Sequence, residues 1–186
     1  MQTYTCFYYS PAPLLRAGFE PAQTLIRRNF IFANYGAAQG VDNDDGSSHY
    51  TIDQNVFFDA DGFKMDYGGH GSVFTSNLVV TKSHGGACIG LGGFEAGNGD
   101  EYSNNTCALV GNTADKVGSI SQCDPAENTM FSNTYFTPSG KGTLGGCGTT
   151  PIKDIFAKDG VEKDSKVEAM PSDAELVAYA KAWLDY

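Results

Sequence analysis

Positive charge is scarce in this sequence of 186 residues. It has 12 Lys and Arg against 22 Asp and Glu, a formal net charge of −10 at pH 7. No segment is rich in Lys or Arg. Proteins bind the phosphates of nucleic acids with clustered positive charge. The sequence therefore argues against nucleic acid as a partner.

Long apolar runs are also missing. No run reaches the roughly 18 residues that a transmembrane helix needs, so we expect no membrane span. The N-terminal segment lacks the basic start and the continuous apolar stretch of a signal peptide. Because the repeats described below begin abruptly, we interpret residues 1–24 as an irregular N-terminal cap or a truncated start.

Cysteine is infrequent and irregularly spaced. The five cysteines form no C-x-x-C or zinc-site pattern. Cys123 and Cys147 follow Ser-rich or Gly-rich segments in neighbouring repeats, so they are a candidate disulfide, which would indicate an oxidising compartment. Buried free thiols are the alternative. We expect an extracellular or cell-surface protein.

Glycine, phenylalanine and tyrosine are abundant, and an asparagine motif repeats among them. Five asparagines recur at spacings of 26, 22, 28 and 28 residues. Each has an apolar or aromatic residue three positions before it, another apolar residue two positions after it, and a polar residue immediately before it. The five are Asn29, Asn55, Asn77, Asn105 and Asn133.

This period predicts a stack of β-strand coils. A repeat of 20 to 50 residues with fixed inward positions indicates a stacked architecture, and the unit shows no helical periodicity. The two apolar positions differ by five, so a single straight strand would point them to opposite faces. We therefore expect a turn at each asparagine, with the asparagine itself in the left-handed conformation. Stacked coils would align the amides into a hydrogen-bonded ladder.

The motif resembles that of the right-handed parallel β-helix proteins of the pectate-lyase-like superfamily. The resemblance rests on RRNFIF, DQNVFF, TSNLVV, NNTCALV and SNTYF and covers about residues 25–150. It implies an all-β chain: a right-handed parallel β-helix of about five coils with an asparagine ladder.

The C-terminal region differs from the repeats. Residues 151–170 read as a connector, and residues 171–186 read as a helix packed on the body. Ser172 and Glu175 form a capping box. Leu176, Val177, Ala180, Trp183 and Leu184 fall on one helical face, with Trp183 as an anchor.

Two acidic segments align when the coils are superimposed on their asparagines. Asp44 and Asp66 each lie 11 residues before their asparagine, and Asp42 and Lys64 each lie 13 before. Alternation along the strands points all four side chains outward. Adjacent coils are about 4.8 Å apart, so we expect Asp44 to lie almost directly over Asp66.

Paired carboxylates at this distance suit proton-transfer chemistry. Close carboxylates push their pKa values apart, so one can serve as a general acid beside a base or nucleophile. A separation of about 5 Å is typical of retaining glycosidases. We expect Asp44 and Asp66 as the catalytic pair assisted by His70, and Asp42, Asp45, Lys64 and Tyr67 as substrate-binding residues.

Three alternatives remain open for this cluster. Calcium is one, held by Asp42, Asp44, Asp45 and Asp66, because clustered carboxylates suit a hard cation. A plain ion pair between Asp42 and Lys64 is the second, and a purely structural charged face is the third. We expect no required cofactor, with calcium possible.

The resemblance adds an expectation about the reaction. In pectate-lyase-like enzymes the catalytic or calcium-binding acids project from the strand before the ladder strand, where Asp42, Asp44, Lys64 and Asp66 lie. D44-D45-G46 and G69-H70-G71-S72 are similar to two motifs of polygalacturonases, although no Arg-x-Lys motif follows His70. The resemblance implies a carbohydrate-active protein, acting as a monomer on a polysaccharide or glycan. A glycoside hydrolase is the first expectation. A non-catalytic glycan-binding or structural β-helix is the alternative, and a polysaccharide lyase that uses Lys64 or Lys82 is the third.

Overall fold

Three stacked sheets form the body of the protein. The computed structural model describes residues 23–34, 39–65, 69–82, 88–91, 99–110, 116–120, 128–145, 150–151 and 161–184. Sheet A contains β1 (Thr24–Arg27), β4 (Tyr50–Asp53), β7 (Val73–Thr75), β10 (Glu101–Ser103), β13 (Thr129–Phe131) and β17 (Val161–Lys163). Sheet B contains β2 (Phe30–Phe32), β5 (Val56–Phe58), β8 (Leu78–Thr81), β11 (Thr106–Leu109), β14 (Thr134–Thr137) and β18 (Lys166–Ala169). Sheet C contains β3 (Val41–Asn43), β6 (Phe63–Met65), β9 (Ile89–Leu91), β12 (Lys116–Ile120), β15 (Thr143–Gly145) and β16 (Thr150–Pro151).

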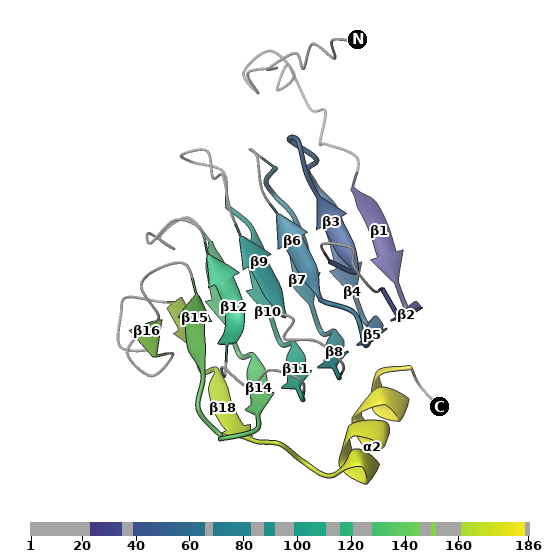
Figure 1. The fold of residues 1–186 in the computed structure, drawn as a ribbon. Coiled ribbons are helices and arrows are strands. Elements are labelled where there is room, and N and C mark those ends of the chain that lie inside the picture. The colour runs from purple at the N-terminus through teal and green to yellow at the C-terminus, as the bar shows by residue number, and fades with distance from the viewer. Residues whose placement is uncertain are drawn as a thin grey trace, which may run out of the picture.

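The order of the strands confirms the predicted parallel β-helix. Up to β15 each sheet takes every third strand along the chain, so one coil contributes one strand to each sheet (Figure 1). The pairs are parallel except for β15 with β16. Each sheet contains six strands, and the sixth strand of sheet C is β16, which follows β15 directly and pairs antiparallel with it. Part of the predicted connector, residues 161–169, forms β17 and β18 and extends sheets A and B.

The core runs through the inside of the stack. Ile52, Phe74, Tyr102 and Met130 stand in register on sheet A, and all four are fully buried. They occupy the position three residues before each asparagine, as the repeat predicted. Within this column the ring centroids of Phe74 and Tyr102 lie 6.4 Å apart, and Phe63, on sheet C, stacks on Phe74 at 5.5 Å.

The asparagines form the expected ladder. The Oδ1 atom of Asn105 accepts hydrogen bonds from the backbone N–H and the side-chain Nδ2 of Asn77, at 3.0 and 3.1 Å. Asn105 repeats this geometry on Asn133, and its Nδ2 also donates to the carbonyl of Phe74 at 2.9 Å. The same contacts link Asn29 to Asn55 and Asn55 to Asn77.

The left-handed residue at each turn was assigned wrongly from the sequence. Within the described residues it is the residue before each asparagine that has a φ near +55°: Arg28, Gln54, Ser76, Asn104 and Ser132. The asparagine is needed because its amide both donates to and accepts from neighbouring coils. The bend is made one residue earlier, which explains why that position is polar and turn-like.

A disulfide crosses the interior between two successive coils. Cys88, next to β9, bonds to Cys107 on β11, and both are fully buried. Cys123 and Cys147, the pair suggested by the sequence, lie outside the described residues, as does Cys6. The chain runs close beside this bridge, since a Cβ on Gly62 would lie 2.0 Å from the carbonyl oxygen of Cys88.

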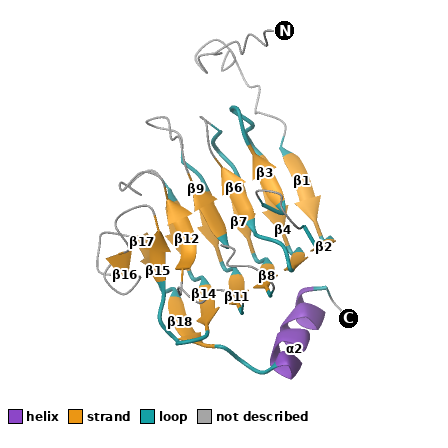
Figure 2. Cartoon of the chain, viewed as in Figure 1, coloured by secondary structure: helices purple, strands orange, loops and turns teal. Residues whose placement is uncertain are grey.

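The C-terminal helix α2 (Asp173–Trp183) lies against the outer face of sheet B (Figure 2). The predicted capping box is present, with the Ser172 N–H donating to Glu175 Oε2 at 2.8 Å. Leu176 is buried against sheet B, and Trp183 packs with it. Val177 was expected on the packed face, but it is 53% exposed and does not belong to that face. No helix among the described residues is long and apolar enough to cross a membrane.

Candidate functional site

An ionic cluster lies on the outer face of sheet C, where the sequence placed the site. β3 and β6 pair in parallel with Asp42 opposite Lys64, as predicted. Lys64 Nζ lies 2.9 Å from Asp42 Oδ1 and 3.6 Å from Asp44 Oδ2. The cross-coil ion pair is therefore real, and one ammonium serves two carboxylates.

Lys64 is held in place by its surroundings. Its side chain is only 17% exposed, while the side chains of Asp42 and Asp44 are 33% and 45% exposed. The next residue in the same column is Gly90. A Cβ there would lie 3.4 Å from Lys64 Cγ and 3.7 Å from Gln39 Nε2. The lysine stem therefore lies over Gly90, and its ammonium reaches the two acids.

The rest of the predicted cluster is only partly described. Asp45 is exposed in a turn, with a φ of +50°, and its N–H donates to Asp44 Oδ1 at 2.9 Å. Asp66 and Tyr67 lie outside the described residues, so the expected stacking of Asp44 on Asp66 stays a prediction. The described residues include no group of three or more His, Cys, Asp or Glu arranged to hold a metal ion. Between Asp42 and Asp44 the position of a cation is taken by the ammonium of Lys64.

His70 belongs to the turn that leads from sheet C to sheet A. Its Nδ1 lies 3.2 Å from Ser48 Oγ. Ser48 Oγ also donates to the carbonyl of Gly46 at 2.8 Å and accepts the backbone N–H of His70 at 3.2 Å. The ring also makes an edge contact with His49 at 5.3 Å, and partial burial together with His70 lowers the pKa of His49.

The sequence analysis missed a buried acid close to this turn. Asp100 is 3% exposed, and its Oδ1 accepts the N–H of Ser72 at 2.8 Å. Burial raises its pKa to about 6, opposed by that hydrogen bond and by His70. The Oδ2 atom is buried and has no hydrogen-bond partner in the part of the chain described, and the hydroxyl of Tyr102 is in the same condition.

Asp100 belongs to a second column that could have been found from spacing. Tyr50, Ser72, Asp100 and Asn128 each lie five residues before a ladder asparagine. Ser72 Oγ accepts from the N–H of Tyr50 at 3.2 Å, and Asn128 Oδ1 accepts from the N–H of Asp100 at 3.0 Å. A small polar residue, Ser, Asp or Asn, five positions before three successive ladder asparagines could have predicted this column from the sequence. These side chains point inward, so the column stabilises the corner and does not extend the outer site.

Comparison with known proteins identifies no relative of this chain. No family model, no curated protein and no solved structure matches this chain. The stacked sheets and the asparagine ladder therefore establish the parallel β-helix fold, and the chemistry must be argued from the cluster on sheet C.

Proposed function

We propose that this chain is a carbohydrate-active β-helix protein of the pectate-lyase-like type, and that it hydrolyses a glycan on the outer face of sheet C. The observation that carries the proposal is the pair of carboxylates, Asp42 and Asp44, that share the half-buried ammonium of Lys64. Such a face offers both acceptors and a donor to sugar hydroxyls. A net charge of −10 favours a neutral polysaccharide over a strongly anionic one.

The ion pairs suggest how the two catalytic roles divide. Lys64 Nζ lies 3.6 Å from Asp44 Oδ2, so the ammonium orients this carboxylate. Asp44 is then the base or nucleophile, and Asp66, one coil further along, is the proton donor. Asp42 and Lys64 orient Asp44 and bind substrate, Asp45 and Tyr67 contact the sugar, and His70 assists the reaction.

A non-catalytic glycan-binding protein is the second candidate. Lys64 neutralises part of the acidic cluster, and an acidic face of this kind also binds hydroxyl groups without any reaction. A lyase, with Lys64 as the base, is third, and calcium would be bound at Asp42, Asp44, Asp45 and Asp66 only if the cation displaced the ammonium.

The disulfide supports a location outside the reducing cytosol. Cys88 and Cys107 are bonded in the core, and structural disulfides persist in oxidising compartments. We propose an extracellular or cell-surface protein. A count of free thiols in the denatured protein, before and after reduction, tests the pairing.

The decisive experiment is a screen of neutral polysaccharides for release of reducing ends. We expect activity in the wild-type chain and a loss of at least about 100-fold in both Asp44→Asn and Asp66→Asn, the scale of losing an acid–base group. Asp164→Asn, an exposed acid on another face, is the matched control and should keep full activity. Calcium and a chelator are compared in parallel.

Each other outcome selects a different function. Binding without product release, weakened by Asp42→Asn and Lys64→Met, would support the glycan-binding protein. Products with a new carbon–carbon double bond, seen by ultraviolet absorbance, would support the lyase. Neither binding nor release with any glycan would overturn the proposal.

A further inference from the structure

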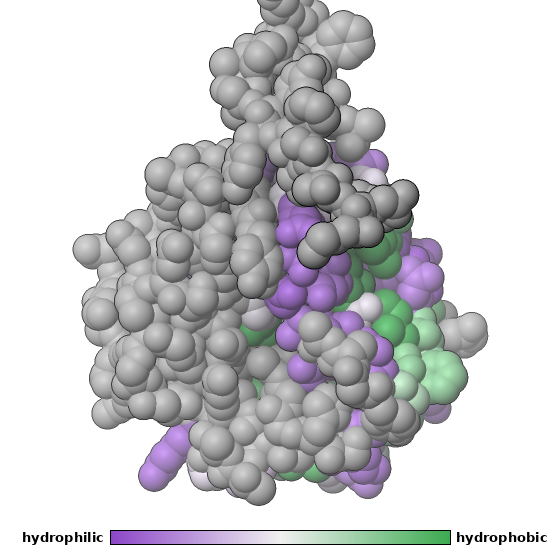
Figure 3. Space-filling view, turned by 45° about the horizontal axis from the view of Figure 1, so that its top comes forward, coloured by the Kyte–Doolittle hydropathy of each residue, from purple (hydrophilic) through white to green (hydrophobic). Residues whose placement is uncertain are grey.

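The first coil presents an unusual edge. β1, β2 and β3 are each the terminal strand of their sheet among the described residues. Leu25 on β1 is 55% exposed, and Phe30 and Phe32 on β2 are 55% and 63% exposed. The two phenyl rings stack with 5.4 Å between centroids. Figure 3 shows hydrophobic side chains on the side of the molecule where these strands lie.

Among the described residues, only β5 pairs with the backbone of β2. The Asn29 N–H donates to Asn55 Oδ1 and the Ala33 N–H donates to the Phe58 carbonyl, both in the second coil. Donors alternate in direction along a strand. The N–H and C=O groups of Phe30 and Phe32 therefore point away from the second coil, towards the open edge.

The opposite end of the stack is protected. β17 is irregular, with a register shift against β13, and the strand residues Lys163, Lys166 and Glu168 are exposed charges. Bulges and charges of this kind prevent strand edges from pairing with another chain. β2, with the sequence Phe-Ile-Phe, carries no charge and no bulge. Stacking the first coil of one chain on the last coil of another is therefore unfavourable. Pairing between the first coils of two chains is the remaining arrangement.

We propose that the edge of β2 is the contact surface of a two-fold symmetric dimer, with a second copy of this chain as its partner. β2 pairs antiparallel with its own copy, and the two-fold axis passes at Ile31. This arrangement replaces the monomer expected from the sequence. It closes on itself, so it forms no filament.

The register follows from the directions of the backbone groups. With the axis at Ile31, Phe30 lies opposite the partner's Phe32, and these two form a hydrogen-bonded antiparallel pair. The four phenyl groups then lie together on the outer face, and cross-strand aromatic pairs are among the favourable contacts of a sheet. The half-buried Ile26 and Ile31, at the open end of the core, are covered by the partner coil.

The sequence of residues 1–22 lacks the pattern of the coil repeat. They contain no asparagine to continue the ladder, and three of them are prolines, which cannot donate to a sheet. This is why the second copy is the preferred occupant of the edge.

The test is the mass of the full chain in solution, by sedimentation or light scattering, over a wide range of concentration. We expect a dimer for the wild type and a monomer for both Phe30→Asp and Phe32→Lys. Because the two side chains are more than half exposed, each variant should keep the circular dichroism spectrum and thermal stability of a folded chain. Val177→Lys changes an equally exposed apolar residue on α2 and should remain a dimer.

Mixing the two variants tests the register. The heterodimer places the new carboxylate opposite the new ammonium and keeps the other Phe–Phe pair, so the mixture should recover dimers that neither variant forms alone. As a control, Phe30→Asp mixed with Val177→Lys should not recover dimers by such charge pairing. A wild-type monomer at every concentration would mean that the edge is covered within its own chain, and it would overturn the proposal. So would dimers that persist in both phenylalanine variants, or monomeric variants that fail to pair when mixed.

Discussion

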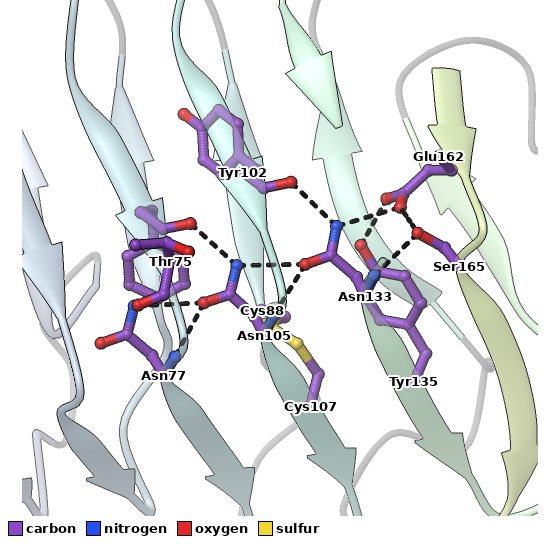
Figure 4. The surroundings of a disulfide bond; sticks show 11 residues. Thr75, Asn77, Cys88, Tyr102, Asn105, Cys107, Asn133, Tyr135, Glu162 and Ser165 are labelled. Carbon is purple, nitrogen blue, oxygen red and sulfur yellow. Dashed lines mark hydrogen bonds between the residues drawn. A yellow bond between two sulfur atoms is a disulfide. The ribbon is translucent and has the colours of Figure 1, made fainter. Parts of the chain in front are cut away.

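Asn133 donates its side-chain Nδ2 to Glu162 Oε2 at 3.0 Å (Figure 4). In every earlier step of the ladder, one asparagine Oδ1 accepts from both the backbone N–H and the Nδ2 of the coil before. At this last step the two tasks are divided, because the Asn133 N–H donates to Ser165 Oγ at 2.8 Å. Glu162 also accepts from Ser165 and from the hydroxyl of Tyr135. The ladder therefore ends in a buried carboxyl.

Replacing this carboxyl should loosen the last coil. Glu162→Leu leaves three donors, Asn133 Nδ2, Ser165 Oγ and the Tyr135 hydroxyl, without their acceptor. We expect a loss of about 3 kcal/mol or more in the free energy of unfolding, since each unsatisfied buried group costs about 1–3 kcal/mol. Glu162→Gln keeps an acceptor and should lose less. In Glu162→Leu, hydrogen exchange should accelerate first at the backbone amide of Asn133. Equal protection of this amide in Glu162→Leu and Glu162→Gln would show that the carboxyl does not hold the last step of the ladder.

Asp100 should make the stability depend on pH. Its pKa is raised to about 6 by burial, from 3.8. Between about pH 4 and 6 the folded form keeps a proton that the unfolded chain has lost, so the free energy of unfolding falls as the pH rises through this window. A shift of about two pH units corresponds to about 3 kcal/mol.

Asp100→Asn should remove that dependence and stabilise the protein at pH 7. An amide still accepts the Ser72 N–H, as Asn128 accepts in the same column. Urea unfolding at pH 4 and pH 7 measures the effect. Asp164→Asn, at an exposed position, is the control and should leave the slope unchanged. An equal slope in Asp100→Asn and the wild type would show that the buried acid does not titrate in this window.

Gly62 and Gly90 should respond very differently to alanine. A Cβ on Gly62 would lie 2.0 Å from the Cys88 carbonyl oxygen, and backbone cannot yield by that amount. Gly62→Ala should therefore prevent folding or lower the thermal midpoint strongly. At Gly90 the nearest atom would be Lys64 Cγ at 3.4 Å, an ordinary contact. Gly90→Ala should fold normally, as judged by circular dichroism, and similar losses in both would refute the close approach at Gly62.

The turn residue before each asparagine should prefer glycine. Ser76 has a φ of +55°, a conformation that costs an L-residue about 1–2 kcal/mol. Ser76→Gly should raise the free energy of unfolding by about 0.5–1 kcal/mol, which is that strain less the roughly 0.5–1 kcal/mol that glycine loses in backbone entropy. Ser76→Val should lower it, because a β-branched side chain fits this region poorly. Denaturant titration of the three proteins gives the order, and a more stable valine variant would contradict it.

Much of the fold could be predicted from the repeat. Asn29, Asn55, Asn77, Asn105 and Asn133 identified the ladder, since one buried amide per coil needs the same residue each time. The aligned offsets gave the register of Asp42 with Lys64, because parallel coils stack residues at equal distances from a common turn. Ser165 and Glu162 were missed, since the last coil satisfies the same hydrogen bonds with different side chains.

The sequence by itself determined the period of the coil, the inward column and the charge on the outer face of sheet C, because local alternation and a repeated turn fix these. Tertiary structure alone decided which atoms meet across coils. It placed the Lys64 ammonium between Asp42 and Asp44, joined Cys88 to Cys107, and buried Asp100 beside Tyr102. Each of these depends on the rotation of side chains and on the exact length of the turns between strands. Spacing along the chain does not encode those distances, because turns of different length can bring the same strands into register.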